Sequence, residues 1–107
     1  MLLVLPQFVC SQETFRDEFN SVSYSNNDGT VNWTSEWIES GDTDSGPSAQ
    51  YIYIQGGELR MEYIWGENIR RTADLAGATA AVLSFDYTTN SLGGSRQLGV
   101  FMSDNRS

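Results

Sequence analysis

The chain has 107 residues, of which 39% are hydrophobic and 19% charged, and fourteen acids against six bases give a net charge of −8. A chain of that length is expected to form one domain. The excess of acids argues against a nucleic-acid backbone or an anionic membrane surface as the partner. The chain contains no His, which removes the commonest general base and the usual zinc ligand.

The first eleven residues resemble the end of a secretory signal peptide. Met1 to Leu5 is apolar, Pro6 interrupts the run, and residues 9–11 fit a small-x-small cleavage pattern. The alternative is an apolar first strand of the domain; a membrane span would need about 20 apolar residues. Because no base precedes the apolar run, we expect either that the true start lies upstream or that the reading frame is clipped. We therefore expect a leader remnant over residues 1–11, a domain over residues 12–107, and a location outside the cell or at its surface.

Cysteine usage agrees with a mature domain that has no disulfide. Cys10 is the only cysteine, and cleavage after Ser11 would remove it. A domain outside the cell would then be stabilised by its packing or by a bound ion instead.

Short runs rich in β-branched and aromatic residues, separated by turn signals, predict an all-β chain with no helix. Seven strands are expected, at residues 14–19, 37–40, 51–54, 59–64, 69–72, 80–88 and 97–102. Gly56 and Gly57 lie between the third and fourth, and Gly-Gly suits a primed two-residue hairpin turn. This pattern is typical of an antiparallel β-sandwich of the jelly-roll type.

The clearest strand pattern lies within residues 75–88. From Ala80 onward, Ala81, Leu83, Phe85 and Tyr87 alternate with more polar positions, which predicts a strand with one face in a core. The last expected strand, at residues 97–102, is followed by a turn and by no further strand. We therefore expect the sandwich to be incomplete on its C-terminal side.

Two motifs carry a resemblance to a known kind of module. Residues 71–87 follow the pattern Arg-x-x-Asp-Leu-x-Gly-Ala-Thr-x-Ala-x-Leu-x-Phe-Asp-Tyr, and residues 27–33 follow Asn-Asp-Gly-Thr-x-Asn-Trp. In these motifs the chain resembles bacterial secreted jelly-roll modules, which are similar to MAM and carbohydrate-binding-module sandwiches. The resemblance implies adhesion or glycan binding, further strands beyond residue 105, and attachment to other domains of a larger secreted protein. It does not imply catalysis.

Aromatic residues are the candidates for a glycan site, because the C–H faces of pyranose rings pack on aromatic surfaces. The candidate ligand-binding residues are Trp33, Tyr51, Tyr53 and Trp65. Trp65 has the best case for exposure because it lies in a turn beside Gly66. The alternative for the other aromatic residues is packing in the core, which is favoured for Trp37 and for one face of the hairpin.

Carboxylates are the candidates for a structural calcium ion. Residues 42–46 begin like a calcium loop but lack the later ligands, so we favour a solvated turn there. Asp17, Asp28 and Asp86 are a better set, since jelly-roll modules often hold an ion between the first strand, the following loop and a late strand. For Asp86 the alternative is a salt bridge with Arg70 or Arg71.

The sequence thus predicts a non-catalytic extracellular module for adhesion or glycan binding. The alternative is a structural spacer stabilised by Ca²⁺, and the least favoured alternative is a fragment of a secreted hydrolase. A glycosidase needs two carboxylates across one cleft, and with fourteen acids in the chain some such pair is inevitable. A Ser/His or Cys/His arrangement is impossible without His.

Overall fold

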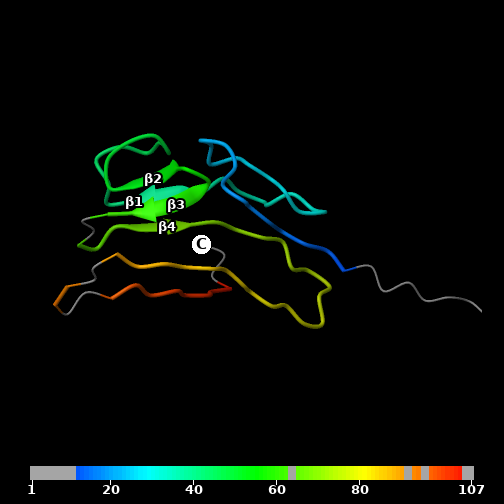
Figure 1. Ribbon diagram of the computed structural model, residues 1–107. Helices are drawn as coiled ribbons and strands as arrows, with labels where there is room; N and C mark the ends of the chain where they lie inside the picture. Colours follow the sequence, from blue (N-terminus) through cyan, green and yellow to red (C-terminus); the bar gives the residue numbers. More distant parts are fainter. Residues whose placement is uncertain (1–11, 63–64, 91–92, 95–96, 105–107) are drawn as a thin grey trace, which may run out of the picture. The chain divides into compact units, whose positions relative to one another are not determined.

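The computed structural model describes residues 12–62, 65–90, 93–94 and 97–104. The chain divides into an N-terminal unit, Met1–Gly77, and a C-terminal unit, Ala78–Ser107. The described residues contain four short strands and no helix, which confirms the all-β class (Figure 1). Among these residues we find no helix that could cross a membrane.

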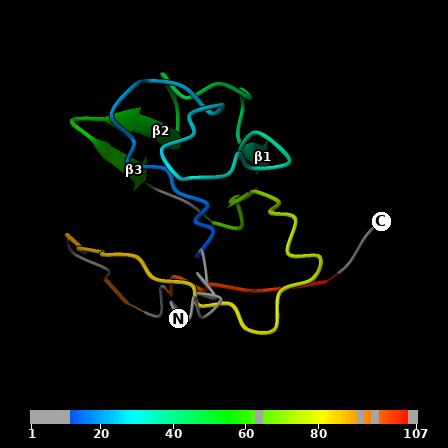
Figure 2. The same cartoon turned by 90° about the vertical axis from the view of Figure 1, so that its right-hand side faces the viewer.

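The four strands form two separate antiparallel pairs, both in the N-terminal unit. Strand β1 (Ile38–Ser40) pairs with β4 (Asn68–Arg70), and β2 (Ile52–Gln55) pairs with β3 (Glu58–Met61). The β2 and β3 arrows lie side by side in both views (Figure 1 and Figure 2). These pairs confirm the antiparallel character of the chain, although they amount to less than a complete sandwich.

The β2–β3 hairpin forms as the sequence predicts. Gly56 and Gly57 have φ angles of 64° and 78°, and two consecutive positive φ values are what a type I′ turn requires. Ile52 and Ile54 point from one face of β2 and are buried, whereas Tyr51 and Tyr53 are only half-buried. The alternation therefore directs the isoleucines into the small core.

The N-terminal segment, residues 12–37, is a set of loops rather than the strand expected at residues 14–19. Phe19 adopts a φ of 54°, which is incompatible with an extended strand. Within this segment, two backbone hydrogen bonds join residues 14–16 to residues 28–31: Asp28 N–H donates to the Arg16 carbonyl at 2.9 Å, and Val31 N–H donates to the Thr14 carbonyl at 3.1 Å.

A buried ion pair between Arg71 and Asp17 connects these loops. Arg71 Nη1 lies 2.7 Å from Asp17 Oδ2, and the two side chains are 1% and 2% exposed. Arg71 also donates from Nη2 to the Asn26 carbonyl at 2.7 Å and from Nε to the Ser35 carbonyl at 3.0 Å. Its guanidinium carbon lies 5.0 Å from the Trp33 ring centroid. The Arg71 side chain thus joins three positions in the N-terminal loops that lie 36, 45 and 54 residues before it in the sequence.

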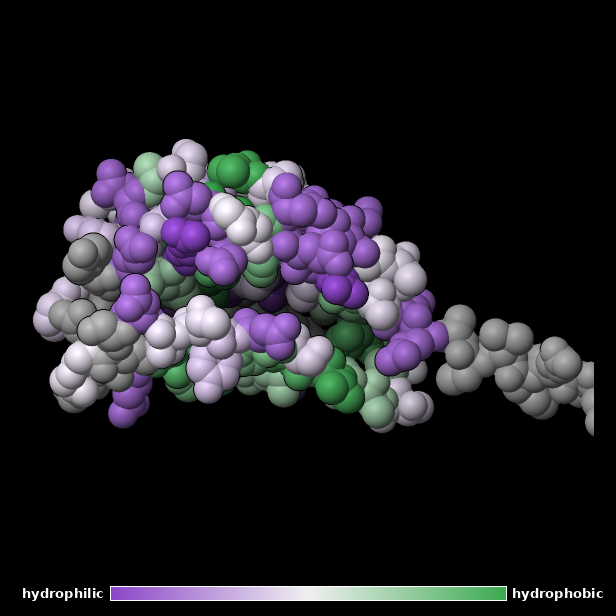
Figure 3. All heavy atoms as spheres, in the orientation of Figure 1, coloured by the Kyte–Doolittle hydropathy of each residue, from purple (hydrophilic) through white to green (hydrophobic). Residues whose placement is uncertain are grey.

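The C-terminal unit contains extended chain but no strand among its described residues, unlike the prediction for residues 80–88 and 97–102. Its apolar side chains are largely exposed, with Val82 and Phe101 at 93% and 91%. Hydrophobic residues accordingly reach the surface of this unit in Figure 3. The alternating pattern sets the direction of side chains, but a strand also needs a partner backbone to form its ladder of hydrogen bonds.

Candidate binding groove and acidic cluster

A groove of about 570 Å³ lies beside the β2–β3 hairpin in the N-terminal unit. Its polar and aromatic lining comes from the loop before β2, from β2, and from the residue after β3: Ser48, Gln50, Tyr53, Gln55 and Glu62. Val22, Ala49, Ile54 and Gly56 complete the lining. An open groove with one aromatic side chain and several uncharged hydrogen-bonding groups suits a polar ligand with apolar faces.

The hairpin register brings the polar residues of the two strands to one face. Tyr53 lies opposite Arg60, and Glu62 N–H donates to the Tyr51 carbonyl at 2.8 Å. Because facing residues of an antiparallel pair share a face, Tyr51, Tyr53, Arg60 and Glu62 project from the face opposite the buried isoleucines. A hydrogen bond with the Glu62 carboxylate is the main reason that the pKa of Tyr53 is raised.

The groove also contains a residue in an unfavourable backbone conformation. Gln50 has a φ of 69°, the left-handed region that residues with a side chain rarely adopt. Such conformations cost free energy, and they gather at ligand sites. The Gln50 amide can both donate and accept hydrogen bonds.

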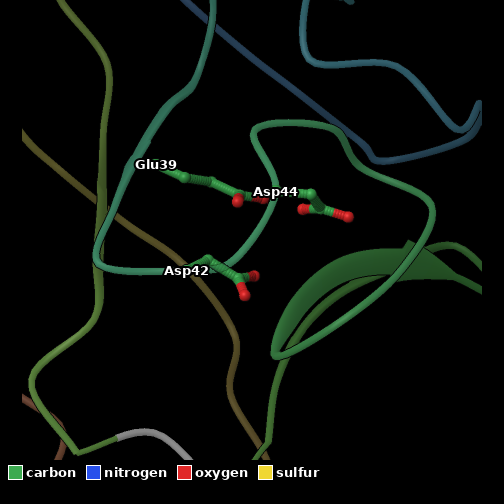
Figure 4. A group of neighbouring side chains, drawn as sticks. All are labelled: Glu39, Asp42 and Asp44. Carbon is green, nitrogen blue, oxygen red and sulfur yellow. The ribbon is translucent and has the colours of Figure 1, made fainter.

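A second cluster gathers three carboxylates on β1 and the loop that follows it (Figure 4). Glu39 comes from β1 and Asp42 and Asp44 from the loop, and one carboxylate oxygen from each lies within 4.8 Å of the others. Asp42 Oδ2 accepts hydrogen bonds from the N–H groups of Tyr51 and Ile52, at 3.2 and 3.0 Å. Asp42 therefore anchors its loop to the start of β2.

The other two carboxylates of the cluster are less well satisfied. Glu39 Oε1 accepts a hydrogen bond from the Tyr24 hydroxyl, but Glu39 Oε2 and Asp44 Oδ1 are buried and have no hydrogen-bond partner. The pKa of Glu39 is raised, mainly because the carboxyl group is buried. The hydrogen bond from Tyr24 acts in the opposite direction, and the negative charges of Asp42 and Asp44 add to the increase. Burial, followed by the hydrogen bond to Glu39, raises the pKa of Tyr24 as well.

The four predicted ligand-binding aromatics lie in different surroundings. Tyr53 lines the groove, and Tyr51 is half-buried beside it on the same face. Trp65 is 82% exposed in its turn, as its position beside Gly66 predicts. Trp33 is half-buried and packs with Phe15, at 5.7 Å between ring centroids, and with Arg71. The structure therefore places only Tyr53 of the four in the groove.

The three acids predicted to bind calcium are distributed over both units. Asp17 accepts hydrogen bonds from Arg71 and from the Trp37 indole nitrogen at 2.9 Å. Asp28 Oδ2 accepts from Glu18 N–H at 2.7 Å and from the Asn26 amide at 2.6 Å. Asp86 belongs to the C-terminal unit, where it is exposed.

Several residues of the two sites escaped the sequence interpretation, although a usable signal was present. The Gly56-Gly57 turn fixes the hairpin register, and this register pairs Tyr53 with Arg60. Counting outward from the turn would therefore have placed Arg60 and Glu62 beside the tyrosines. In the acidic cluster, residues 42–46 were considered as a calcium loop and interpreted as a solvated turn, but no local signal joins Glu39 to them, because their proximity depends on how the loop after β1 folds back.

Comparison with protein-family models, with curated proteins and with solved structures finds no match for this chain. The case for a function therefore depends on the chain's own residues.

Proposed function

We propose that this chain is a non-catalytic extracellular module that binds glycans through the groove beside Tyr53. The observation that carries the proposal is the pairing of a half-buried tyrosine with uncharged hydrogen-bonding groups in one open groove, above all the Gln50 and Gln55 amides. The apolar C–H face of a sugar ring would pack on the Tyr53 ring. Its hydroxyls would exchange hydrogen bonds with the two amides and with the Ser48 hydroxyl.

The wider setting that we propose is a jelly-roll-type β-sandwich belonging to a larger secreted or surface protein. The all-β class of the described residues supports this fold, and the leader-like composition of residues 1–11 supports export. Adhesion through glycans fits a chain in which fourteen acids oppose six bases, a charge balance that disfavours anionic polymers as partners.

Tyr53→Ala is expected to weaken glycan binding by at least about fivefold, because removing an aromatic anchor typically costs more than about 1 kcal/mol. The measurement is binding of the full chain and its variants to an array of immobilised glycans, with affinities from titration of the best ligands.

Tyr87→Ala is the matched control, since Tyr87 is an exposed tyrosine of the C-terminal unit. It should bind like the unaltered chain. Absence of binding to every glycan, or equal binding by both variants, would remove the proposal.

A structural calcium ion is a second candidate role, and one observation favours it. Glu39 Oε2 and Asp44 Oδ1 are buried without a hydrogen-bond partner, in a group of three carboxylates. Calcium takes oxygen ligands of this kind, and a cation between the two oxygens would relieve the repulsion of like charges. The ligands would then be Glu39 and Asp44, with Asp42 contributing its charge nearby.

Calcium is accordingly expected to raise the free energy of unfolding, by about 2.7 kcal/mol when its concentration is about 100 times its Kd. Thermal melting in EDTA and in calcium measures the effect. Asp44→Asn should abolish the response, whereas Asp104→Asn, at an exposed position in the other unit, should retain it. Equal melting temperatures of the unaltered chain in both buffers would exclude the calcium role.

A further inference from the structure

The charge of the residues that line the groove beside Tyr53 affects which glycans it can bind. Among the described residues that line it, Glu62 is the one with a carboxylate, and none is basic. Glu62 is exposed, and its carboxylate is the main reason that the pKa of Tyr53 is raised. A sugar ring stacked on Tyr53 would thus have a negative charge as its neighbour.

The nearest base on this face of the hairpin is already engaged. Arg60 lies opposite Tyr53, and its Nε lies 3.3 Å from Glu58 Oε2. Its Nη1 donates to the Gln55 side-chain oxygen at 3.1 Å. Glu58 therefore offsets the charge of Arg60, so the carboxylate of Glu62 is left as the net charge of this face of the hairpin.

The charge of the whole chain acts in the same direction. A net charge of −8 gives a negative potential that repels anionic ligands over distances comparable with the Debye length, about 8 Å at physiological ionic strength. The uncharged members of the lining, Ser48, Gln50 and Gln55, suit sugar hydroxyls, with which amides and hydroxyls exchange hydrogen bonds.

We infer that the groove binds uncharged glycans in preference to acidic ones, and that Glu62 is the residue that sets this preference. This inference rests on the proposed function. Two unit charges about 4 Å apart repel by about 1 kcal/mol even at the dielectric constant of water. An acidic glycan should therefore bind at least about fivefold more weakly than its uncharged counterpart, and the difference should shrink in high salt.

The test uses matched pairs of oligosaccharides in which only the charge differs. Neutral oligomers of glucose, mannose, galactose and xylose are compared with counterparts in which uronic acids replace neutral residues, and with the methyl esters of those acids. Binding of each member is measured for the full chain, Glu62→Gln, Tyr53→Ala and Glu13→Gln. The last variant removes the same charge outside the groove, and circular dichroism verifies that each variant is folded.

Neutral oligomers and methyl esters should bind alike, and the free acids should bind at least about fivefold more weakly. Glu62→Gln should reduce the ratio of the affinity for the ester to that for the acid, whereas Glu13→Gln should leave this ratio unchanged. Equal binding of acid and ester, or a ratio of their affinities that Glu62→Gln does not change, would overturn the selectivity even if Tyr53→Ala still weakened binding. Failure of every oligomer to bind, or binding indifferent to Tyr53→Ala, would overturn the proposed glycan function and this inference together.

Discussion

Arg71→Ala is expected to destabilise the chain by about 3–5 kcal/mol, the usual cost of removing one partner from a buried ion pair. The Asp17 carboxylate, 2% exposed, would lose its cation and remain buried. The carbonyls of Asn26 and Ser35 would each lose a donor. The stacking of the guanidinium on the Trp33 ring would be lost as well. Unfolding in urea, followed by tryptophan fluorescence, measures the change.

The chain contains a matched control for this prediction. Arg16 and Glu18 form an ion pair at 2.8 Å whose side chains are 65% and 46% exposed, and exposed pairs contribute only about 0–1 kcal/mol. Arg16→Ala should therefore leave the unfolding midpoint almost unchanged. If both variants lost the same stability, the buried pair would not be the element that fastens the loops.

Gly29→Ala is expected to lower the free energy of unfolding by about 3 kcal/mol, the upper end of the range for forced overpacking. A Cβ at this position would lie 2.1 Å from the Thr14 carbonyl oxygen and 2.9 Å from the Arg16 nitrogen. Both are backbone atoms, so the clash cannot be relieved by rotating a side chain. The two loops would have to separate, and the hydrogen bonds from Asp28 and Val31 would break.

Gly46→Ala provides the comparison for this substitution. A Cβ at Gly46 would meet no atom within 4 Å, so the added methyl group should leave stability unchanged or raise it by at most about 1 kcal/mol. Thermal melting of the two variants side by side distinguishes the cases. A Gly29 variant that melts with the unaltered chain would contradict the close approach of the loops.

The local parts of the fold were predictable from the sequence. The Gly-Gly turn imposes a hairpin, and β-branched and aromatic residues flank it, so β2 and β3 appear where the pattern places them. Strand β1 falls within the range expected at residues 37–40, and β4 overlaps the range expected at residues 69–72 but begins one residue earlier. In each case the deciding chemistry lies within a few residues of the element.

The remainder depends on contacts between distant residues, which a local pattern does not contain. The strand expected at residues 14–19 gives way to loops because Asp17 turns inward to Arg71, 54 positions away. The alternation at residues 80–88 was identified correctly as a sequence pattern, but no strand forms there in the described chain. Alternation of apolar and polar residues specifies which side chains share a face of a strand. A sheet forms only when a neighbouring backbone supplies the hydrogen-bond partners.

The candidate sites divide in the same way. Tyr53 was identifiable as an aromatic residue on the face opposite the isoleucines, and it lines the groove. The path of the loop between β1 and β2 decides where the Gln50 side chain lies and whether Glu39 and Asp44 come together. Turn-forming residues mark such a loop in the sequence, but they do not determine its path.

The most direct test of the proposal that the groove binds glycans is a titration of the isotope-labelled chain with the tightest-binding uncharged oligosaccharide, in which NMR records the shifts of the amide signals. The proposed function predicts saturable shifts at residues 48–50, at residues 53–56 and at Glu62, with the amides around Trp33 and Trp65 unmoved. Shifts centred on those tryptophans, or none at millimolar ligand, would contradict it.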